Sequence, residues 1–326
     1  MPIRTTHPAL LSIALVFALG LSGCAGITKP TPTPAPVPLK IALLPFIDAL
    51  PVHVAEQEGL FTKAGLQVEL IPVSAAPQRD QLIAAGQADG MVNEILSSFF
   101  FNKQQVQVQV VRYDLVPTAK SPHFFIMASA KSGITRPEQL KGVPIGVSQS
   151  TIIEYVTERV LQAQGFAPDD IKTIAVPNMS DRMTLLASGE LKAAVLPDPL
   201  AALAIQQGAV SVLDDAAYPH WGFSVITFRK AVIDQHPEAI RAFLAAVEQA
   251  VQMVNASPAK YTSLLSDKKI VPAPLLGTYL APPFPLAGVP TEAEWQDALA
   301  WAKAKGLITV DVPYATTVNA SFLPKP

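Results

Sequence analysis

The chain has 326 residues, of which 50% are hydrophobic and 15% are charged, and its formal net charge is -2. This balance supplies no basic surface for nucleic acid, while the length and apolar content predict one or two domains with sizeable cores. Cys24 is the only cysteine, so we expect no internal disulfide and no cysteine nucleophile or metal ligand in the folded body.

The N-terminal residues have the pattern of a signal peptide. Arg4 precedes the apolar run 9–19, which is too short to span a bilayer comfortably. Leu21-Ser22-Gly23-Cys24 resembles the lipobox of bacterial lipoproteins. The resemblance implies cleavage after residue 23 and a lipid on Cys24, which would hold the protein outside the cytoplasm on the cell membrane. The alternative is an uncleaved anchor helix.

A proline-rich segment follows the cysteine. Proline alternates with small residues from Lys29 to Pro38. Such a sequence favours an extended polyproline-like spacer with a rise of about 3 Å per residue. We therefore assign residues 24–38 to the lipid anchor and linker, and expect the folded body to begin at Leu39.

From Leu39 the chain alternates predicted strands with predicted helices. The expected strands are 39–44, 68–71 and 90–92, and the expected helices are 52–63, ending at Gly65, and 78–85, closed by Gly86. Further helices are predicted for 152–164, from Pro237 onward and for 295–305. Alternation at this spacing is typical of βαβ units with a parallel sheet.

The same pattern occurs twice. The segment Arg79–Gln87 is echoed by Arg182–Glu190, Ile41-Ala42-Leu43 by Ile145-Gly146-Val147, and two further pairs keep the same order, all at offsets of 100 to 105 residues. We infer two similar α/β lobes. The matched arginines, Arg79 and Arg182, stand at equivalent helix positions, which favours a structural role for both.

Two apolar stretches flank the second repeat, 124–127 and 223–228, and we interpret them as hinge strands between the lobes. The predicted organisation is a signal peptide at 1–23, the anchor and linker at 24–38, lobe 1 at 39–127 plus 220–326, and lobe 2 at 128–219.

Several segments resemble one family of proteins. They are Ile41–Pro45, Pro51–Phe61, Ala64–Glu69, Gly133–Gly142 and His236–Phe243. In this order they resemble the substrate-binding proteins of ABC importers of the thiamine-pyrimidine-precursor and alkanesulfonate type, over about residues 39–308. The resemblance implies a type II periplasmic binding protein fold, in which two lobes close on a small-molecule ligand. It also implies an ABC permease and ATPase as partners. The lipobox, and the lack of a Ser-His-Asp, Cys-His or metal constellation in the sequence, favour a protein that is not an enzyme.

The predicted ligand site follows from the strand pattern, because ligands of open α/β sheets bind beyond the carboxyl ends of the strands. In the first lobe these positions hold Phe46, Asp48, Asn93 and Glu94, and in the second lobe they hold Gln149, Ser150, Thr151 and Asp198. Tyr113 and Trp221 precede the two hinge stretches and are predicted to wall the site.

Two of these positions keep alternatives open. Ser148–Thr151 leads into the helix 152–164, where the hydroxyl groups cap free N–H groups or, with those groups, hold an anion. Asp198 resembles the "DP" step of the family, but sulfonate-type relatives usually have a preceding aromatic residue where this chain has Leu196-Pro197.

The acids Asp48, Glu94 and Asp198 outnumber the bases among the predicted site residues. Acidic and aromatic groups suit an amine-bearing or neutral heteroaromatic molecule, such as a pyrimidine-like vitamin precursor, better than an anion. We also expect a monomer without cofactor or metal. The alternatives are a sulfonate- or nitrate-binding importer component, an enzyme of the same fold (thiamine-pyrimidine synthase or menaquinone-pathway type), and a ligand-sensing lipoprotein.

Overall fold

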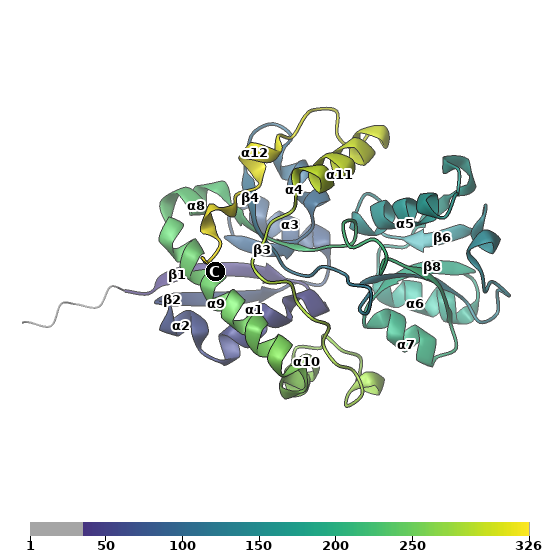
Figure 1. Cartoon of the computed structure of the whole chain (residues 1–326), viewed down its shortest axis with the longest axis horizontal. Coiled ribbons are helices and arrows are strands. Elements are labelled where there is room, and N and C mark those ends of the chain that lie inside the picture. Colours follow the sequence, from purple (N-terminus) through teal and green to yellow (C-terminus); the bar gives the residue numbers. More distant parts are fainter. Residues whose placement is uncertain (1–34, 326) are drawn as a thin grey trace, which may run out of the picture. The chain divides into compact units, whose positions relative to one another are not determined.

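The computed structural model describes residues 35–325, so the predicted signal peptide and Cys24 lie outside the described residues. The described part contains two mixed sheets, one in each half of the ribbon in Figure 1. Each has five strands, in the orders β2-β1-β3-β10-β4 and β7-β6-β8-β5-β9. No helix within residues 35–325 is long and apolar enough to cross a membrane.

The first sheet consists of β1 (Val37–Leu43), β2 (Leu66–Pro72), β3 (Gly90–Asn93), β4 (Val108–Tyr113) and β10 (Val225–Arg229). The second consists of β5 (Phe124–Ala128), β6 (Pro144–Val147), β7 (Lys172–Ala175), β8 (Ala193–Pro197) and β9 (Val210–Asp214). We call β5–β9 with their helices the second lobe, and the rest of residues 35–325 the first lobe.

The helices of the first lobe are α1 (Leu50–Gln57), α2 (Leu60–Lys63), α3 (Ala76–Ala84), α4 (Ile95–Asn102), α8 (Lys230–Gln235), α9 (Pro237–Ala256), α10 (Thr262–Asp267), α11 (Glu292–Ala304) and α12 (Tyr314–Thr317). Those of the second lobe are α5 (Ile152–Ala163), α6 (Met179–Ser188) and α7 (Leu200–Gln206). Short 3-10 turns are η1 (Ile47–Ala49), η2 (Pro137–Leu140), η3 (Pro168–Asp170), η4 (Pro258–Tyr261), η5 (Ala273–Leu275) and η6 (Ala320–Phe322).

The internal repeat is confirmed at the level of strand register. In the first sheet Ile41 and Ala42 pair with Gly90 and Met91, and in the second Ile145 and Gly146 pair with Ala193 and Ala194, all in parallel. Each sheet also has one antiparallel strand at the equivalent position, β10 in the first and β5 in the second. The two lobes therefore share one topology, as the sequence repeat predicts.

Three of the differences from the predicted boundaries change how the chain is divided into elements. Residues 37 and 38, predicted as linker, belong to β1, because the backbone of Val37–Leu43 pairs with β2 along its whole length. The helix predicted for 52–63 is two helices, since Gly59 adopts a positive φ of 66° and interrupts it. Both expected hinge stretches form sheet strands: β5 pairs with β8 and β9 inside the second sheet, and β10 pairs with β3 and β4 inside the first. Residues 124–127, predicted as part of lobe 1, therefore belong to the second lobe.

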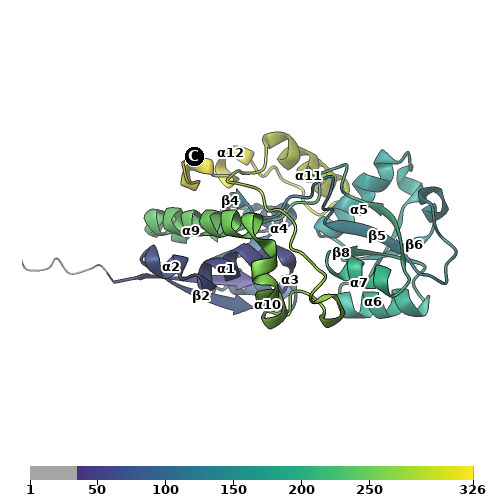
Figure 2. The ribbon, with the colours of Figure 1, turned by 60° about the horizontal axis from the view of Figure 1, so that its bottom comes forward.

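A long amphipathic helix stabilises the first lobe. In α9 the apolar residues recur at helical spacing, and Ile240, Phe243, Leu244, Val247 and Val251 are buried at 0% exposure. This face packs against α1 and α2 (Figure 2). The Phe243 ring stacks there on Phe61, with centroids 4.9 Å apart.

Candidate functional site

Two crossings bring the strand ends of the two sheets together. One runs from the end of β4 to the start of β5 (residues 114–123), and the other from the end of β9 to the start of β10 (residues 215–224). Since β4 and β9 are parallel to the central strands of their sheets, each crossing joins the carboxyl-terminal edge of one sheet to that of the other. The predicted site residues lie along these edges.

The crossings are hydrogen-bonded to each other at both ends. Near the first sheet, the N–H of Asp114 donates to the Ser224 carbonyl at 2.9 Å, and the N–H of Ser224 donates to the Leu115 carbonyl at 2.8 Å. Near the second sheet, Asp215 Oδ1 accepts from the N–H groups of His123 (2.7 Å) and Phe124 (3.2 Å). The region that joins the lobes is thus a bonded pair of segments.

Asp48 follows Phe46 in the turn that leads from β1 into α1. Phe46 is partly buried, whereas the Asp48 side chain is only 9% exposed. Burial raises the pKa of Asp48 to about 6, although a hydrogen bond from Ser224 and the charge of Arg79 act in the opposite direction. Asp48 is therefore a carboxyl group that titrates close to neutral pH at the edge of the first sheet.

A second buried acid, Asp114, lies beside Asp48 and was not predicted from the sequence. It is fully buried, and neither of its carboxyl oxygens has a hydrogen-bond partner among the described residues. Burial, together with the charge of Asp48, raises the pKa of Asp114 well above its ordinary value. Its position directly after the buried strand Val108–Tyr113 is the sequence feature that could have identified it.

Asn93 and Glu94 have partners within the first lobe. The Asn93 Oδ1 accepts from the Thr227 hydroxyl at 2.6 Å, while its Nδ2 donates to the hydroxyls of Ser97 and Ser98 at 3.4 Å. Glu94 caps α4, since its carboxylate accepts from the N–H of Leu96 at 2.8 Å and of Ser97 at 3.2 Å. These bonds fix the end of β3 and leave both residues less free to bind a ligand.

The two predicted aromatic residues pack against different aromatic partners. The Tyr113 hydroxyl donates to Glu294 Oε2 at 2.6 Å, and its ring meets the Phe223 ring edge-on with centroids 5.1 Å apart. Trp221 stacks on Tyr218 with centroids 4.7 Å apart, and the Tyr218 hydroxyl bonds to Gln164 at the end of α5. Tyr113 therefore belongs to the edge of the first sheet and Trp221 to the second crossing, and both pack against one apolar cluster.

In the second lobe Gln149, Ser150 and Thr151 form the turn between β6 and α5. Thr151 is the N-cap, because its Oγ1 accepts from the N–H of Ile153 at 3.2 Å and donates to the Ser148 carbonyl at 2.7 Å. Ser150 has a positive φ of 61°, and its N–H donates to Glu154 Oε2 at 2.7 Å. The capping alternative is thus observed, while Gln149 is exposed.

Asp198, at the end of β8, is bonded to the first lobe. The hydroxyl of Tyr279, in the loop between α10 and α11, donates to its Oδ2. Burial raises the pKa of Asp198 to about 6, against the effect of this hydrogen bond. No pattern in the proline-rich loop predicts that Tyr279 reaches the second lobe.

The two matched arginines lie behind these edges in equivalent positions. Arg182 Nη1 donates to the Val195 carbonyl at 2.7 Å, and Arg79 Nη1 to the Val92 carbonyl at 3.4 Å. Arg182 has all its partners inside the second lobe, in agreement with a structural role. The buried Nη2 of Arg79, in contrast, has no partner among the described residues, and its charge acts on both Asp48 and Glu94.

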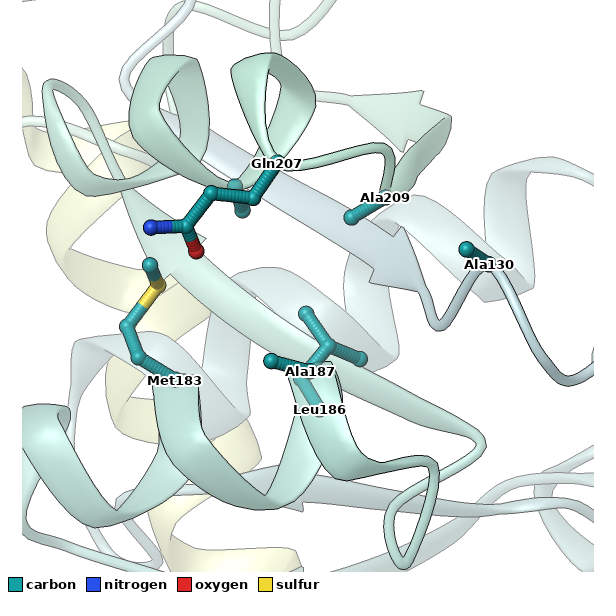
Figure 3. Close-up of a pocket in the computed structure, with 7 residues that line it drawn as sticks. Ala130, Met183, Leu186, Ala187, Gln207 and Ala209 are labelled. Carbon is teal, nitrogen blue, oxygen red and sulfur yellow. The ribbon is translucent and has the colours of Figure 1, made fainter.

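Two hollows elsewhere contain none of the predicted site residues. A small cavity of about 30 Å³ lies in the second lobe between Met183 and Leu186 of α6, Ala204 of α7, and Ala130 (Figure 3). This volume corresponds to about one or two water molecules. A groove of about 1050 Å³ runs beside α9 in the first lobe, lined in part by Lys63, Gln249 and Leu286.

The buried acids predict a pH dependence of stability. Burial raises the pKa of Glu94 and of Asp215 to about 7, and that of Asp114 is also raised. The folded chain therefore holds protons that the unfolded chain has already released, and the free energy of unfolding falls as pH rises from about 6.5 to 8, by about 2 kcal/mol. His53 and His123, whose pKa values are lowered to about 4, contribute in the opposite direction; most of that gain falls between pH 4 and 6.5, and the remainder offsets only part of the fall.

Urea unfolding at pH 6.5 and at pH 8 measures this difference in the free energy of unfolding. The substitution Asp114→Asn should reduce it, whereas Asp234→Asn, at an exposed position, should leave it unchanged. Equal stability of the natural chain at both pH values would contradict the assignment.

Comparisons with known proteins agree with this architecture. Residues 47–261, more than half of the chain, match the model of the family described as NMT1/THI5 like. A protein of Brucella abortus (strain 2308), described as a binding protein, is 24% identical over 210 residues. That match covers 63% of this chain and 63% of the relative, so the chain spans less than two thirds of the length of the curated relatives that it matches.

Solved structures share the fold. The alkanesulfonate-binding protein SsuA from Xanthomonas axonopodis pv. citri, bound to MOPS, has a TM-score of 0.73 at 18% identity, over 88% of this chain and 99% of that chain. The nitrate-binding protein NrtA from Synechocystis PCC 6803 has a TM-score of 0.63 at 15% identity, over 88% and 87%. The desulfurization enzyme DSZB has a TM-score of 0.66 at 16% identity, over 88% and 97%. The fold is thus that of periplasmic binding proteins, and the match over residues 47–261 shows that this chain belongs to the NMT1/THI5-like family.

Proposed function

We propose that this protein is the extracytoplasmic solute-binding component of an ABC importer. It captures a small organic molecule between its two lobes and delivers it to a permease that works with an ATPase. The family membership and the likeness to periplasmic binding proteins support this role. So do the two crossings, which place the carboxyl-terminal strand ends of both sheets at the junction of the lobes.

The predicted lipid on Cys24 would keep the protein at the outer face of the membrane, which suits a monomeric binding protein that serves a permease. The same fold occurs in an enzyme, DSZB. A location outside the cytoplasm argues against the two intracellular enzyme types considered above, and we propose that the ligand leaves the protein unchanged.

The observation that carries the choice of ligand is the pair of buried acids at the edge of the first sheet. Asp48 lies close enough to Asp114 for its charge to raise the pKa of Asp114, and both oxygens of Asp114 lack a partner in the described part of the chain. A buried polar group without a partner is costly, so groups of this kind favour a ligand that supplies hydrogen-bond donors. An amino-substituted heteroaromatic ring offers N–H donors to a carboxylate and a ring nitrogen to a protonated carboxyl group.

A second candidate is a sulfonate- or nitrate-type anion. The buried, unpartnered Nη2 of Arg79 favours it, because a guanidinium group donates well to an oxyanion. Asp48 and Glu94 lie in the field of the same arginine, and their carboxyl groups oppose an anion there. We therefore favour the amine-bearing ligand.

A thermal-shift screen of the full chain tests the function. Vitamins, aminopyrimidines, flavins, alkanesulfonates, nitrate and amino acids are added singly, and a ligand of the folded state raises the melting temperature. The ligand is then recovered after incubation. Recovery of an unchanged heteroaromatic amine would support the proposal, whereas conversion to a product would establish an enzyme instead.

A further inference from the structure

The segment between α10 and α11 contacts both lobes. We call residues 271–290 the strap. It is anchored on the first lobe through Phe284, whose backbone N–H and carbonyl both bond to the Asn255 side chain at 2.8 Å. Two further bonds hold it there, from Arg112 Nη2 to the Pro285 carbonyl at 2.8 Å and from the N–H of Tyr113 to the Gly288 carbonyl at 2.7 Å.

The other end of the strap lies against the second lobe. Leu276 and Tyr279 are partly buried in the same apolar cluster as Ala202 and Leu203 of α7. Within the strap, the N–H groups of Thr278 and Tyr279 both donate to the Leu275 carbonyl, at 3.1 and 3.0 Å, which forms a tight turn. This turn presents the Tyr279 hydroxyl to Asp198.

The Tyr279–Asp198 hydrogen bond joins two anchored groups. Asp198 is fixed on its own side, because its N–H donates to the His123 carbonyl at 2.9 Å in the first crossing. Both side chains are only partly exposed. If one of them were removed, the other would lose its hydrogen bond, and water would replace that bond poorly. A bond to a carboxylate is also stronger than one between neutral groups.

The lobes also meet at a separate place, between α5 and α11. Asp297 of α11 accepts from Arg159 Nη2 at 2.8 Å and from the Tyr155 hydroxyl at 2.5 Å. Glu158 accepts from Trp301 Nε1 and from Lys305 Nζ, both at 2.8 Å. The α5–α11 contact has several hydrogen bonds and would persist if one of them were lost. The strap, in contrast, has a single polar bond to the second lobe among the described residues.

We propose that the strap is a latch between the lobes, fastened by the hydrogen bond from Tyr279 to Asp198. The α5–α11 contact keeps one side of the lobes joined. The latch joins them at α7 through a small apolar contact and one polar bond, so it is the contact that opens first when the lobes move apart. The proposal does not depend on the identity of the ligand.

Hydrogen exchange of the full chain, without added ligand, tests the latch. The substitution Tyr279→Phe removes only the hydroxyl and should speed exchange about tenfold in the strap and in α7, because loss of one charge-assisted bond lowers the local opening energy. Exchange in α5 and α11 should not change. Tyr261→Phe is the matched control, since the Tyr261 hydroxyl bonds to Glu58 within the first lobe.

A pair of substitutions at Asp198 separates a latch from a general packing effect. Asp198→Ala should reproduce the effect of Tyr279→Phe, and the double variant should add little to either. Asp198→Asn keeps an acceptor oxygen and should restore most of the protection. Unchanged exchange in the strap and α7, or faster exchange spread evenly over both lobes, would overturn the proposal; neither result would bear on whether the protein binds a solute.

Discussion

Replacing Arg182 by methionine is expected to lower the free energy of unfolding by about 3 kcal/mol or more. The Arg182 side chain is fully buried, and its guanidinium group donates to the Val176 carbonyl at 2.7 Å, the Val195 carbonyl at 2.7 Å and the Ser148 hydroxyl at 2.6 Å. Methionine fills a similar volume but donates nothing. The Val195 carbonyl is buried and the other two acceptors are partly buried. A buried acceptor left without a donor costs about 1–3 kcal/mol, and the loss of the two partly buried bonds adds to this.

Urea unfolding of the full chain measures this loss. Arg136→Met is the matched control, because Arg136 is exposed and should tolerate the change. Burial lowers the pKa of Arg182 to about 10, so the guanidinium group stays protonated at neutral pH. The decrease in the free energy of unfolding should therefore depend little on pH between 6 and 8. A loss below about 1 kcal/mol would mean that the three strand ends of the second lobe do not depend on this arginine.

Asp48→Asn is expected to weaken binding of an amine-bearing heteroaromatic ligand by about 10- to 100-fold. A hydrogen bond to a charged group contributes about 1.5–3 kcal/mol, and the amide can no longer act as a carboxylate toward the ligand. The same substitution removes a buried acid with a pKa of about 6, so it should not destabilise the fold above neutral pH. Loss of affinity is thereby separated from loss of folding.

Calorimetry with the ligand found in the screen measures the change in affinity. Asp234→Asn is the control, since Asp234 is exposed and pairs with Lys230 at 2.6 Å on α8. An unchanged affinity of the Asp48 variant would place the ligand elsewhere.

The sequence predicts the architecture well because the repeat is visible in short segments of consecutive residues. The arginine–glycine spacing shared by Arg79–Gln87 and Arg182–Glu190 reflects equivalent helices, and the register of the neighbouring strands confirms their equivalence. Boundaries are less certain from sequence because they depend on partners. Val37 and Pro38 look like linker until β2 pairs with them, and Phe124–Met127 looks like a connector until β8 and β9 flank it.

The site is harder to predict because proximity in space leaves little trace in the sequence. Asn93 and Glu94 stand at a strand end as expected, but their polar atoms are engaged by Thr227 and by the start of α4. Asp114 was missed because its burial beside Asp48 depends on how the crossing folds. Tyr279 lies in a proline-rich loop without periodic pattern, and only the packing of the strap on α7 brings it to Asp198.

The most direct test of the proposed function is isothermal calorimetry of the purified full chain with an aminopyrimidine and with an alkanesulfonate, at the same pH and salt concentration. The buried acids Asp48 and Asp114 predict that the aminopyrimidine binds tightly and that the alkanesulfonate binds weakly or not at all. Tight binding of the alkanesulfonate, with no binding of any aminopyrimidine or flavin, would contradict the account and assign the site to an anion held by Arg79.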